Sequence, residues 1–344
     1  MKGIVSYGIS LPSFRITTEE IAKAHNKNPK LFEKGLGVTE KAVSDKDEDA
    51  ATLAIEAGRR TLDASNTDSQ KISAVYVGSE SHPYSVKPTS TIVGDMLKVS
   101  PYYFSADLQF ACKAGTAAMQ IIHAFLKSES INYGLAIGSD TAQGAPGDVL
   151  EYTAACGAAA FLLGNNKEEV IAEIVDTVSF SSDTPDFWRG VSEKFPSHGG
   201  RFTGEPGYFK HIEKSTKAIL EKTKLSIDDF DHVIFHMPNG VFPKRMAKKL
   251  HVSDEQLSQG YIVPKIGNTY SASSLIGLAN VLDNAKAGEK ILLSSYGSGA
   301  GSDSFVLQVT ENITKFQSSK KVKELIEEKT YINYQEYLKM RGKI

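Results

Sequence analysis

The sequence predicts an α/β protein built from two related halves. Segments typical of buried strands alternate with segments of helical periodicity along most of the chain. A length of 344 residues favours two units of similar size over one simple core. The composition, 41% hydrophobic and 23% charged, is that of an ordinary globular protein in water.

The first half is expected to begin with a short strand-like run ended by Pro12. A helix over 16–25 is expected next, because Thr17 and Glu20 match an N-terminal capping box. The further helices expected there are 48–64, 89–99 and 112–127, and the strands are 73–80, 133–140 and 158–164. The helix 112–127 is rich in small residues at its start, which would allow close packing against neighbouring elements.

The second half repeats this style. Its expected elements are an amphipathic helix over 211–226, a strand over 232–239, a short basic helix over 242–250, a helix over 271–285, and two strands flanking a Gly/Ser loop within 290–309. Residues 315–344 are rich in Lys and Glu and are expected to form a solvated amphipathic helix and tail.

An internal repeat supports two halves, placed at 1–166 and 167–344. The segments 112–127 and 133–140 resemble 268–283 and 290–299: each has a polar residue, a helix of small residues and then a buried strand. Cys112 and Asn268 fall at nearly equivalent places. Because open α/β sheets bind ligands at the carboxyl ends of strands, the two loops are expected to meet at one central site.

Charge and composition exclude several classes of partner. A net charge of −2 and a pI of about 6.5 argue against nucleic acid or an anionic membrane surface. The longest apolar stretches, such as 154–163, are too short to span a bilayer, and the N-terminal residues lack the features of a signal peptide. Two cysteines make no disulfide framework, which predicts a cytoplasmic protein. Without CxxC or HExxH spacing, no metal is expected.

Cys112 is the candidate nucleophile. It lies in LQFACKAGTAA, where a strand-like run meets a helix of small residues, and a thiol at a helix N-terminus gains thiolate character. The alternative is an inert buried cysteine. Cys156 lies in the apolar run TAACGAAA and is interpreted as structural.

Three other side chains could act beside it. His236, after the strand VIF, could donate to a developing oxyanion, or it could be a satisfied structural histidine. Asn268 could be a second donor or a helix N-cap. Glu80, at the end of a buried strand, could have a raised pKa and act as general base or acid, or could be a solvated loop residue. The histidines interpreted as structural or surface residues are His82, His123, His198, His211, His232 and His251.

The ordered set of motifs resembles the hydroxymethylglutaryl-CoA synthases of the archaeal type, within the thiolase superfamily. The segments that carry the resemblance are GLGVTEK (35–41), VGSES (77–81), QFACKAGT (109–116), EYTAACGAAA (151–160), GGRFTGEPGYFKH (199–211), HMPNG (236–240), GNTYSAS (267–273) and GSGAGSD (297–303). Each string is short, but their order over residues 1–315 is specific. The resemblance implies a thiolase-like fold with α-β-α-β-α layers.

The resemblance also implies roles for individual residues. Cys112 would carry the acyl group, Glu80 would be the general base and acid, and His236 would be the catalytic histidine. The implied substrate-binding residues are Thr153, Thr203, Arg245, Asn268 and Ser298, and the implied CoA-binding residues are Arg201 and Lys244. Family members commonly carry Lys where this chain has Val241; Lys244, Arg245, Lys248 or Lys249 would have to compensate.

The implied reaction condenses acetyl-CoA with acetoacetyl-CoA and water to give 3-hydroxy-3-methylglutaryl-CoA, in the mevalonate route to isoprenoids. It needs no cofactor beyond the CoA of its substrates. The resemblance suggests a homodimer, and a complex with an acetoacetyl-CoA thiolase and a zinc-ribbon/OB-fold bridging protein. The alternatives are a condensing enzyme like ketoacyl-ACP synthase III, which would not need Glu80, and a non-catalytic acyl-CoA scaffold, which would need no intact Cys112 and His236.

Overall fold

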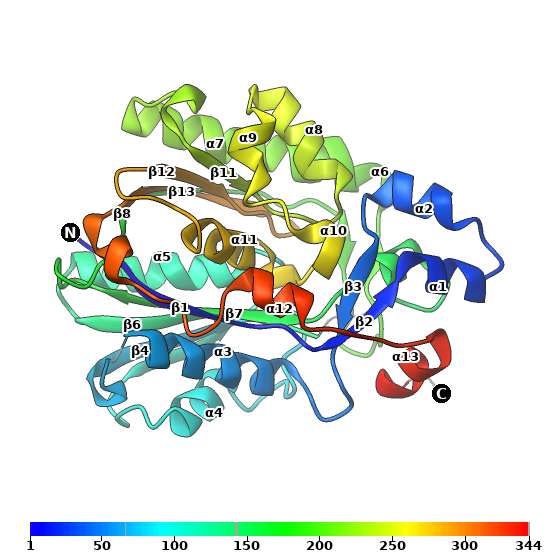
Figure 1. Ribbon diagram of the computed structural model, residues 1–344, viewed down its shortest axis with the longest axis horizontal. Coiled ribbons are helices and arrows are strands. Elements are labelled where there is room, and N and C mark those ends of the chain that lie inside the picture. The colour runs from blue at the N-terminus through cyan, green and yellow to red at the C-terminus, as the bar shows by residue number, and fades with distance from the viewer. Residues whose placement is uncertain (66, 142–143, 343–344) are drawn as a thin grey trace.

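The computed structural model describes residues 1–65, 67–141 and 144–342. Its first part contains adjacent strands in the order β5 (Phe104–Leu108), β4 (Ile72–Gly78), β6 (Tyr133–Asp140), β7 (Gly157–Gly164) and β1 (Gly3–Ser10). Strands β1 and β7 are buried along their whole length, as expected where both faces of a sheet are covered. The helices α3 (Ala50–Ser65) and α4 (Thr89–Met96) cover the outer face (Figure 1).

The second part contains β11 (His232–Phe235), β12 (Lys290–Ser294), β13 (Gly301–Val309) and β8 (Ala172–Ser181), in that order. Its outer face is covered by α7 (Lys210–Thr223), α8 (Val241–Leu250) and α9 (Asp254–Ser258) (Figure 1). Strand β8 was not expected from the sequence. Most of its residues after Ile174 are partly or fully exposed, so it lacks the continuous apolar run that marks the buried strands.

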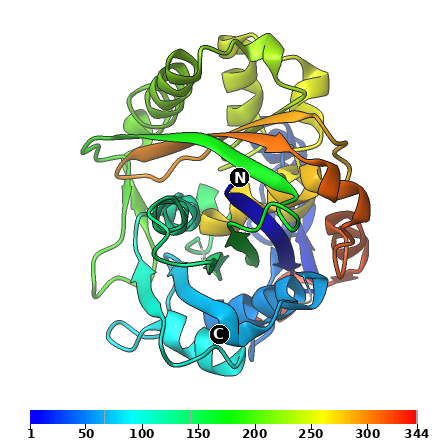
Figure 2. The same ribbon diagram turned by 90° about the vertical axis from the view of Figure 1, so that its left-hand side faces the viewer.

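A narrow joint connects the two parts. Strands β1 and β8 pair where Gly3 meets Glu173 and Ile4 meets Ala172, and this makes one nine-stranded sheet within the described ranges. Beyond the joint the parts separate, and the helices α5 (Ala114–Lys127) and α11 (Ser273–Leu282) lie between them (Figures 1 and 2). The predicted α-β-α-β-α layering is therefore confirmed for the part of the chain that the structure describes.

The central helices follow the internal repeat. Helix α5 precedes β6 and helix α11 precedes β12, as the sequence predicts. Small residues let their N-terminal ends approach: a Cβ on Gly115 would lie 2.7 Å from the carbonyl oxygen of Ser271, and one on Gly138 would lie 2.4 Å from it. Close approach of these ends brings the residues before each helix to one place. The predicted division at residue 166 falls in the connection between β7 and β8 and stays a prediction.

A small sheet packs beside the layers. Its strands are β14 (Thr330–Tyr331), β2 (Phe14–Thr17) and β3 (Glu40–Val43), and the helices α1 (Thr18–Ala24), α2 (Pro29–Leu36) and α13 (Tyr334–Met340) lie near it (Figure 1). Helix α1 begins at Thr18, two residues later than predicted, because residues 16 and 17 belong to β2; Thr17 caps it as predicted, its side chain accepting a hydrogen bond from the backbone N–H of Glu20 at 3.1 Å.

The expectation of a solvated amphipathic helix and tail over 315–344 is partly wrong for the residues up to 342: short helices form, but the segment also adds a strand to the small sheet. Strand β14 pairs in parallel with β2, and helix α12 (Val322–Glu327) precedes it. The apolar residues of this segment, Val322, Leu325, Ile332 and Tyr337, are buried. The high Lys and Glu content concealed these widely spaced apolar positions; residues 343 and 344 lie outside the described residues.

Candidate active site

Cys112 lies in the turn that connects β5 to α5. The turn is closed by the backbone N–H of Lys113, which donates to the carbonyl of Phe110 at 3.2 Å. Ala111 has a φ of 45°, a conformation that residues with a Cβ seldom adopt and that occurs often at functional sites. The thiol of Cys112 is 5% exposed and donates to Oε1 of Glu80 at 3.1 Å. The turn therefore presents the thiol directly to a carboxylate.

Asp140 holds the loop that carries Glu80. At the end of β6, its Oδ1 accepts from the backbone N–H of Glu80 at 2.8 Å and from the hydroxyls of Ser79 and Ser81 at 2.9 and 2.7 Å. Its Oδ2 accepts from the N–H and hydroxyl of Ser271, at 3.0 and 2.6 Å. Asp140 thus ties the Glu80 loop to the segment just before α11. Sequence reasoning missed this residue, although it ends a strand that was predicted.

Burial and neighbouring carboxylates govern protonation of the Cys112–Glu80 pair. Burial, and then the charge of Asp140, raises the pKa of Glu80 to about 8, as its place after a buried strand predicted. Burial, and then the neighbouring Glu80, raises the pKa of Cys112 well above its ordinary value. The thiolate character expected from the helix N-terminus is therefore wrong for the free protein, because desolvation and a carboxylate 3.1 Å away outweigh the helix.

His236 follows β11 and is fixed through its backbone. Its N–H donates to the carbonyl of Ser294 at 3.0 Å, and its carbonyl accepts from the hydroxyl of Tyr208 at 2.7 Å. Burial lowers the pKa of the imidazole to about 3. The ring is therefore neutral near neutral pH and can donate a hydrogen bond from one nitrogen.

Asn268 is held by the segment that contains Thr153. Its N–H donates to the carbonyl of Thr153 at 2.7 Å, and its carbonyl accepts from the N–H of Ala155 at 2.9 Å. Its Oδ1 accepts from the N–H of Tyr270, at 2.9 Å, which caps the turn that leads into α11. The Nδ2 group is then the part of this amide that can donate to a ligand.

A cavity of about 290 Å³ brings many of the predicted residues together. Its wall includes six of them: Cys112, Thr153, Thr203, His236, Asn268 and Ser298. Aromatic rings form much of the remaining wall: Phe187, Tyr208, Phe242, Tyr270 and Tyr296. His198, interpreted from the sequence as a structural or surface residue, also lines this cavity. Few polar groups among aromatic walls are typical of a small-molecule site.

Glu80 reaches Cys112 from a second hollow of about 490 Å³. This hollow shares Phe187 and Tyr270 with the cavity, and Arg189 in its wall donates to the carbonyl of Glu80 at 3.0 Å. The Cys112–Glu80 contact therefore lies between the two spaces.

The predicted basic contacts lie outside the wall of the cavity. Arg201 stacks on Phe202, with 4.7 Å from its guanidinium carbon to the ring centre. Lys244 and Arg245 line a third hollow of about 400 Å³. The other residues of that hollow are Lys34, Gly37, Gly240, Val241, Lys248 and Tyr261. Leu36 and Phe242 line the cavity itself, and each is next in the sequence to a residue of this basic hollow, Gly37 or Val241. The two spaces therefore adjoin.

Asp186 is a further residue that sequence reasoning missed. Its side chain is buried and lines the cavity; it accepts from the hydroxyl of Tyr296 at 2.5 Å and from the N–H of Gly299 at 2.7 Å. It therefore fixes the Gly/Ser loop that carries Ser298. No motif marks residue 186 in the sequence, so no signal was available to find it.

The second cysteine, Cys156, lies in a structural setting. Cys156 is buried and its Sγ lies 3.6 Å from the hydroxyl oxygen of Ser44, in agreement with its interpretation as structural. Among residues 1–65, 67–141 and 144–342, no three His, Cys, Asp or Glu side chains gather where they could hold a metal ion. Over the same ranges, no helix has the length and apolar character needed to cross a membrane.

Curated relatives match the chain along its whole length. It is 55% identical to a hydroxymethylglutaryl-CoA synthase of Archaeoglobus fulgidus, over 100% of this chain and 99% of that protein. Similar matches are the hydroxymethylglutaryl-CoA synthases of Methanocaldococcus jannaschii, 53% identical, and Methanosphaera stadtmanae, 52% identical, each covering 100% of this chain and 99% of the relative.

Solved structures match the fold. A crystal structure of HMG-CoA synthase complexed with CoA gives a TM-score of 0.88 at 24% identity, covering 98% of this chain and 90% of that chain. MvaS in complex with 3-hydroxy-3-methylglutaryl coenzyme A gives 0.91 at 22% identity, covering 99% and 91%. Residues 220–309 match the family model for the C-terminal part of 3-oxoacyl-[acyl-carrier-protein] synthase III. These likenesses confirm the predicted thiolase-like fold.

Proposed function

Because the chain belongs to the hydroxymethylglutaryl-CoA synthase family, we propose that it condenses acetyl-CoA with acetoacetyl-CoA and water to give 3-hydroxy-3-methylglutaryl-CoA and CoA. The observation that carries this proposal is the contact of 3.1 Å between the Cys112 thiol and the Glu80 carboxylate, beside a cavity that His236 and Asn268 line. A nucleophile, a base and oxyanion donors are the groups that a two-step condensation through an acyl-enzyme requires.

In the first step, Sγ of Cys112 attacks the carbonyl carbon of acetyl-CoA, and the bond from that carbon to the CoA sulfur breaks. The proton that leaves the Cys112 thiol ends on the departing CoA sulfur, so the step is balanced; Glu80, 3.1 Å from the thiol, can relay it and returns to the carboxylate. The acetylated Cys112 carries no charge. Its acetyl group lies beside the carboxyl group of Glu80, whose pKa of about 8 suits a base near neutral pH.

In the second step, the Glu80 carboxylate removes a proton from the acetyl methyl group, and the resulting carbanion attacks the ketone carbon of acetoacetyl-CoA. The neutral ring of His236 and the amide of Asn268 donate hydrogen bonds to the alkoxide that forms. The proton taken by Glu80 balances the one that the alkoxide gains. Water then cleaves the thioester to Cys112, which releases the product as a free carboxylate and restores the thiol.

The substrate contacts proposed are Thr153, Thr203 and Ser298 within the cavity, with Arg245 at the adjoining basic hollow. Lys244 lies beside Arg245 in this basic hollow, which supports a role for Lys244 in binding the phosphates of CoA. Arg201 is proposed as a further CoA contact. The neighbouring Lys34 and Lys248 can supply the positive charge that Val241 does not.

Assembly and location are also proposed. The edge strand β5 carries exposed aromatic rings, Phe104 at 52% and the preceding Tyr102 at 90% exposure, which supports a homodimer through this edge. A complex with an acetoacetyl-CoA thiolase and a zinc-ribbon/OB-fold bridging protein rests on the family resemblance. The need for a free Cys112 thiol supports a cytoplasmic location.

A 3-oxoacyl-[acyl-carrier-protein] synthase III is the competing function, because its family model matches residues 220–309. Such an enzyme would form its carbanion by decarboxylating malonyl-ACP and would not need a base at Glu80. The direct contact of Glu80 with Cys112 favours the synthase. Intact Cys112, His236 and Glu80 in one site disfavour a non-catalytic scaffold.

The test is intact-mass measurement after incubation with acetyl-CoA, followed by addition of acetoacetyl-CoA. Wild type and Glu80→Ala should gain one acetyl group, Cys112→Ala should gain none, and wild type alone should release 3-hydroxy-3-methylglutaryl-CoA. Condensation with malonyl-ACP in place of acetoacetyl-CoA would favour the competing enzyme. Failure of wild type to acetylate would favour the scaffold.

A further inference from the structure

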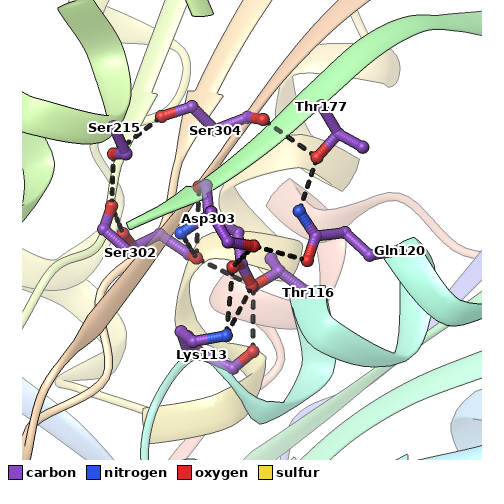
Figure 3. A network of polar contacts seen from close by, with 10 residues as sticks. Lys113, Thr116, Gln120, Thr177, Ser215, Ser302, Asp303 and Ser304 are labelled. Carbon is purple, nitrogen blue, oxygen red and sulfur yellow. Dashed lines mark hydrogen bonds and ion pairs between the residues drawn. The ribbon is translucent and has the colours of Figure 1, made fainter. Parts of the chain in front are cut away.

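A buried ion pair adjoins the nucleophile and joins the two parts of the molecule. Lys113, the residue after Cys112, is 4% exposed, and its Nζ lies 3.0 and 3.1 Å from the carboxylate oxygens of Asp303. Asp303 is fully buried on β13, in the second part of the sheet. Figure 3 shows Lys113 at the start of α5 pointing to Asp303 across the layer boundary.

Further contacts hold the two charged side chains of this pair in place. Oδ2 of Asp303 accepts from the hydroxyl of Thr116 at 2.9 Å, and Oδ1 accepts from the hydroxyl of Ser179 on β8 at 2.7 Å (Figure 3). Nζ of Lys113 also lies 4.0 Å from the ring centre of Phe110, within the same turn as Cys112. The pair thus links the Cys112 turn, α5, β8 and β13.

The Gly/Ser loop is shaped to receive this turn. A Cβ on Gly297 would lie 2.4 Å from the carbonyl oxygen of Phe110, and one on Gly301 would lie 2.8 Å from Cε of Lys113. Ser298, which follows Gly297, lines the cavity together with Cys112. The ion pair and the glycines therefore fix the Cys112 turn against the loop that brings Ser298 to the same cavity.

We infer that Lys113 and Asp303 are positioning residues for Cys112, which hold its thiol in register with the cavity wall contributed by the second part of the chain. Two observations carry this inference. Ala111 needs support in its unfavourable conformation, with φ at 45°, and the neighbouring ion pair supplies a fixed anchor two residues away. A buried ion pair contributes little net stability compared with an apolar pair of similar shape, so its value here lies in the geometry that it imposes.

The consequence concerns acylation, and this part of the inference rests on the proposed function. A displacement of about 1 Å at a reacting atom can lower a rate by roughly 100-fold without changing substrate affinity. Loss of the pair should therefore lower the rate of Cys112 acetylation at saturating acetyl-CoA and leave the KM for acetyl-CoA nearly unchanged.

The first test uses the double variant Lys113→Met/Asp303→Asn, which removes both charges, keeps the volumes, and leaves no buried charge unpaired. We expect a roughly 10- to 100-fold lower acetylation rate, with KM within about three-fold of wild type. The matched control is Lys329→Met/Glu40→Gln, which removes another largely buried ion pair, in the small sheet, and should acetylate at the wild-type rate. Wild-type acetylation by a folded Lys113→Met/Asp303→Asn variant would overturn the inference.

A second variant, Gly301→Ala, keeps both charges and crowds the Phe110 ring and Cε of Lys113, which would lie 2.7 and 2.8 Å from the added Cβ. It decides the matter where the double variant fails to fold: slow acetylation supports the inference, and a wild-type rate overturns it. Alkylation of Cys112 by iodoacetamide, followed by peptide mass mapping, gives a readout that does not need acetyl-CoA. If wild type alkylates but never acetylates, the proposed function fails, and the inference is then judged by alkylation alone: an altered rate or pH profile in the variants supports it, and an unaltered one overturns it.

Discussion

At the scale of single residues, Glu80 makes ionisation of Cys112 harder. Their side chains are 3.1 Å apart, and a thiolate beside a carboxylate is a repulsive pair in a poorly solvated site. The pair therefore retains a proton near neutral pH. Acetylation replaces the ionisable thiol by an uncharged thioester, and Glu80 is then the base that lies beside the acetyl group in the next step.

Replacement of Glu80 by Gln should make the thiol more reactive. Because Glu80 raises the pKa of Cys112 through its charge and its hydrogen bond, Glu80→Gln should lower that pKa. The rate of iodoacetamide alkylation at Cys112, followed against pH by peptide mass mapping, should rise at a lower pH than in wild type. Cys156, which is buried and whose Sγ contacts the hydroxyl of Ser44, serves as the internal reference. An unchanged or higher midpoint would contradict the coupling.

The same substitution should change stability with pH. The folded pKa of Glu80, about 8, lies above its ordinary value of 4.5, so the folded protein binds more protons than the unfolded chain between these values. The contribution of Glu80 to the stability of wild type should therefore fall as pH rises from about 5 to 8. Glu80→Gln has no group that titrates there and should not show this loss. Urea unfolding midpoints of wild type and Glu80→Gln at pH 5 and pH 8 measure this difference. If the variant exceeds wild type in stability by no more at pH 8 than at pH 5, the prediction is contradicted.

The donors at the cavity should matter for the carbon–carbon bond more than for loading the enzyme. His236→Ala or Asn268→Ala should each lower kcat for product formation by roughly 10²–10³-fold, the cost of removing one oxyanion donor. An acetyl-enzyme should still form by intact mass. Product release at near the wild-type rate from either variant would remove that residue from the proposed role.

At the scale of elements, the close approach of α5 and the following strand β6 to the segment just before α11 sets the site. A Cβ on Gly138 would lie 2.4 Å from the backbone oxygen of Ser271, which cannot move aside as a flexible side chain can. Gly138→Ala should therefore destabilise the protein by about 1–3 kcal/mol in urea unfolding, as overpacking does. Gly35→Ala in α2 is the control, because nothing lies within 4 Å of its added Cβ, and it should be neutral or slightly stabilising. Equal behaviour of the two variants would contradict this account.

The elements also show what a sequence can predict. The buried strands and the helices α5 and α11 were predictable, because their apolar runs and small residues are local in the sequence. Cys112 and His236 were predictable for the same reason, since each stands at the end of such a run. Asp140 and Asp186 act through bonds to segments remote in the sequence, and no local pattern records them. The basic residues of α8 were expected at the substrate, and the structure places them at an adjoining hollow.

At the scale of the whole molecule, the proposed dimer depends on the free edge of the large sheet. Phe104→Glu places a charge on β5, the edge strand, and should convert a dimer to a monomer in sedimentation velocity experiments. Val175→Glu is the control, because Val175 is similarly exposed, at 46%, on β8 within the other part of the sheet. A Phe104→Glu variant that sediments as a dimer would place the interface elsewhere.

The pairing of β14 with β2 has a consequence for the order of events on the ribosome. The backbone N–H of Tyr334 donates to Glu20 at a separation of 314 residues, so synthesis of nearly the whole protein intervenes between the partners. Until residues 330–342 emerge, the nascent chain carries β2 with one edge unpaired. A translation product that stops before residue 330 would keep that edge open and would be prone to pair with other chains, so the small sheet is completed only at the end of synthesis.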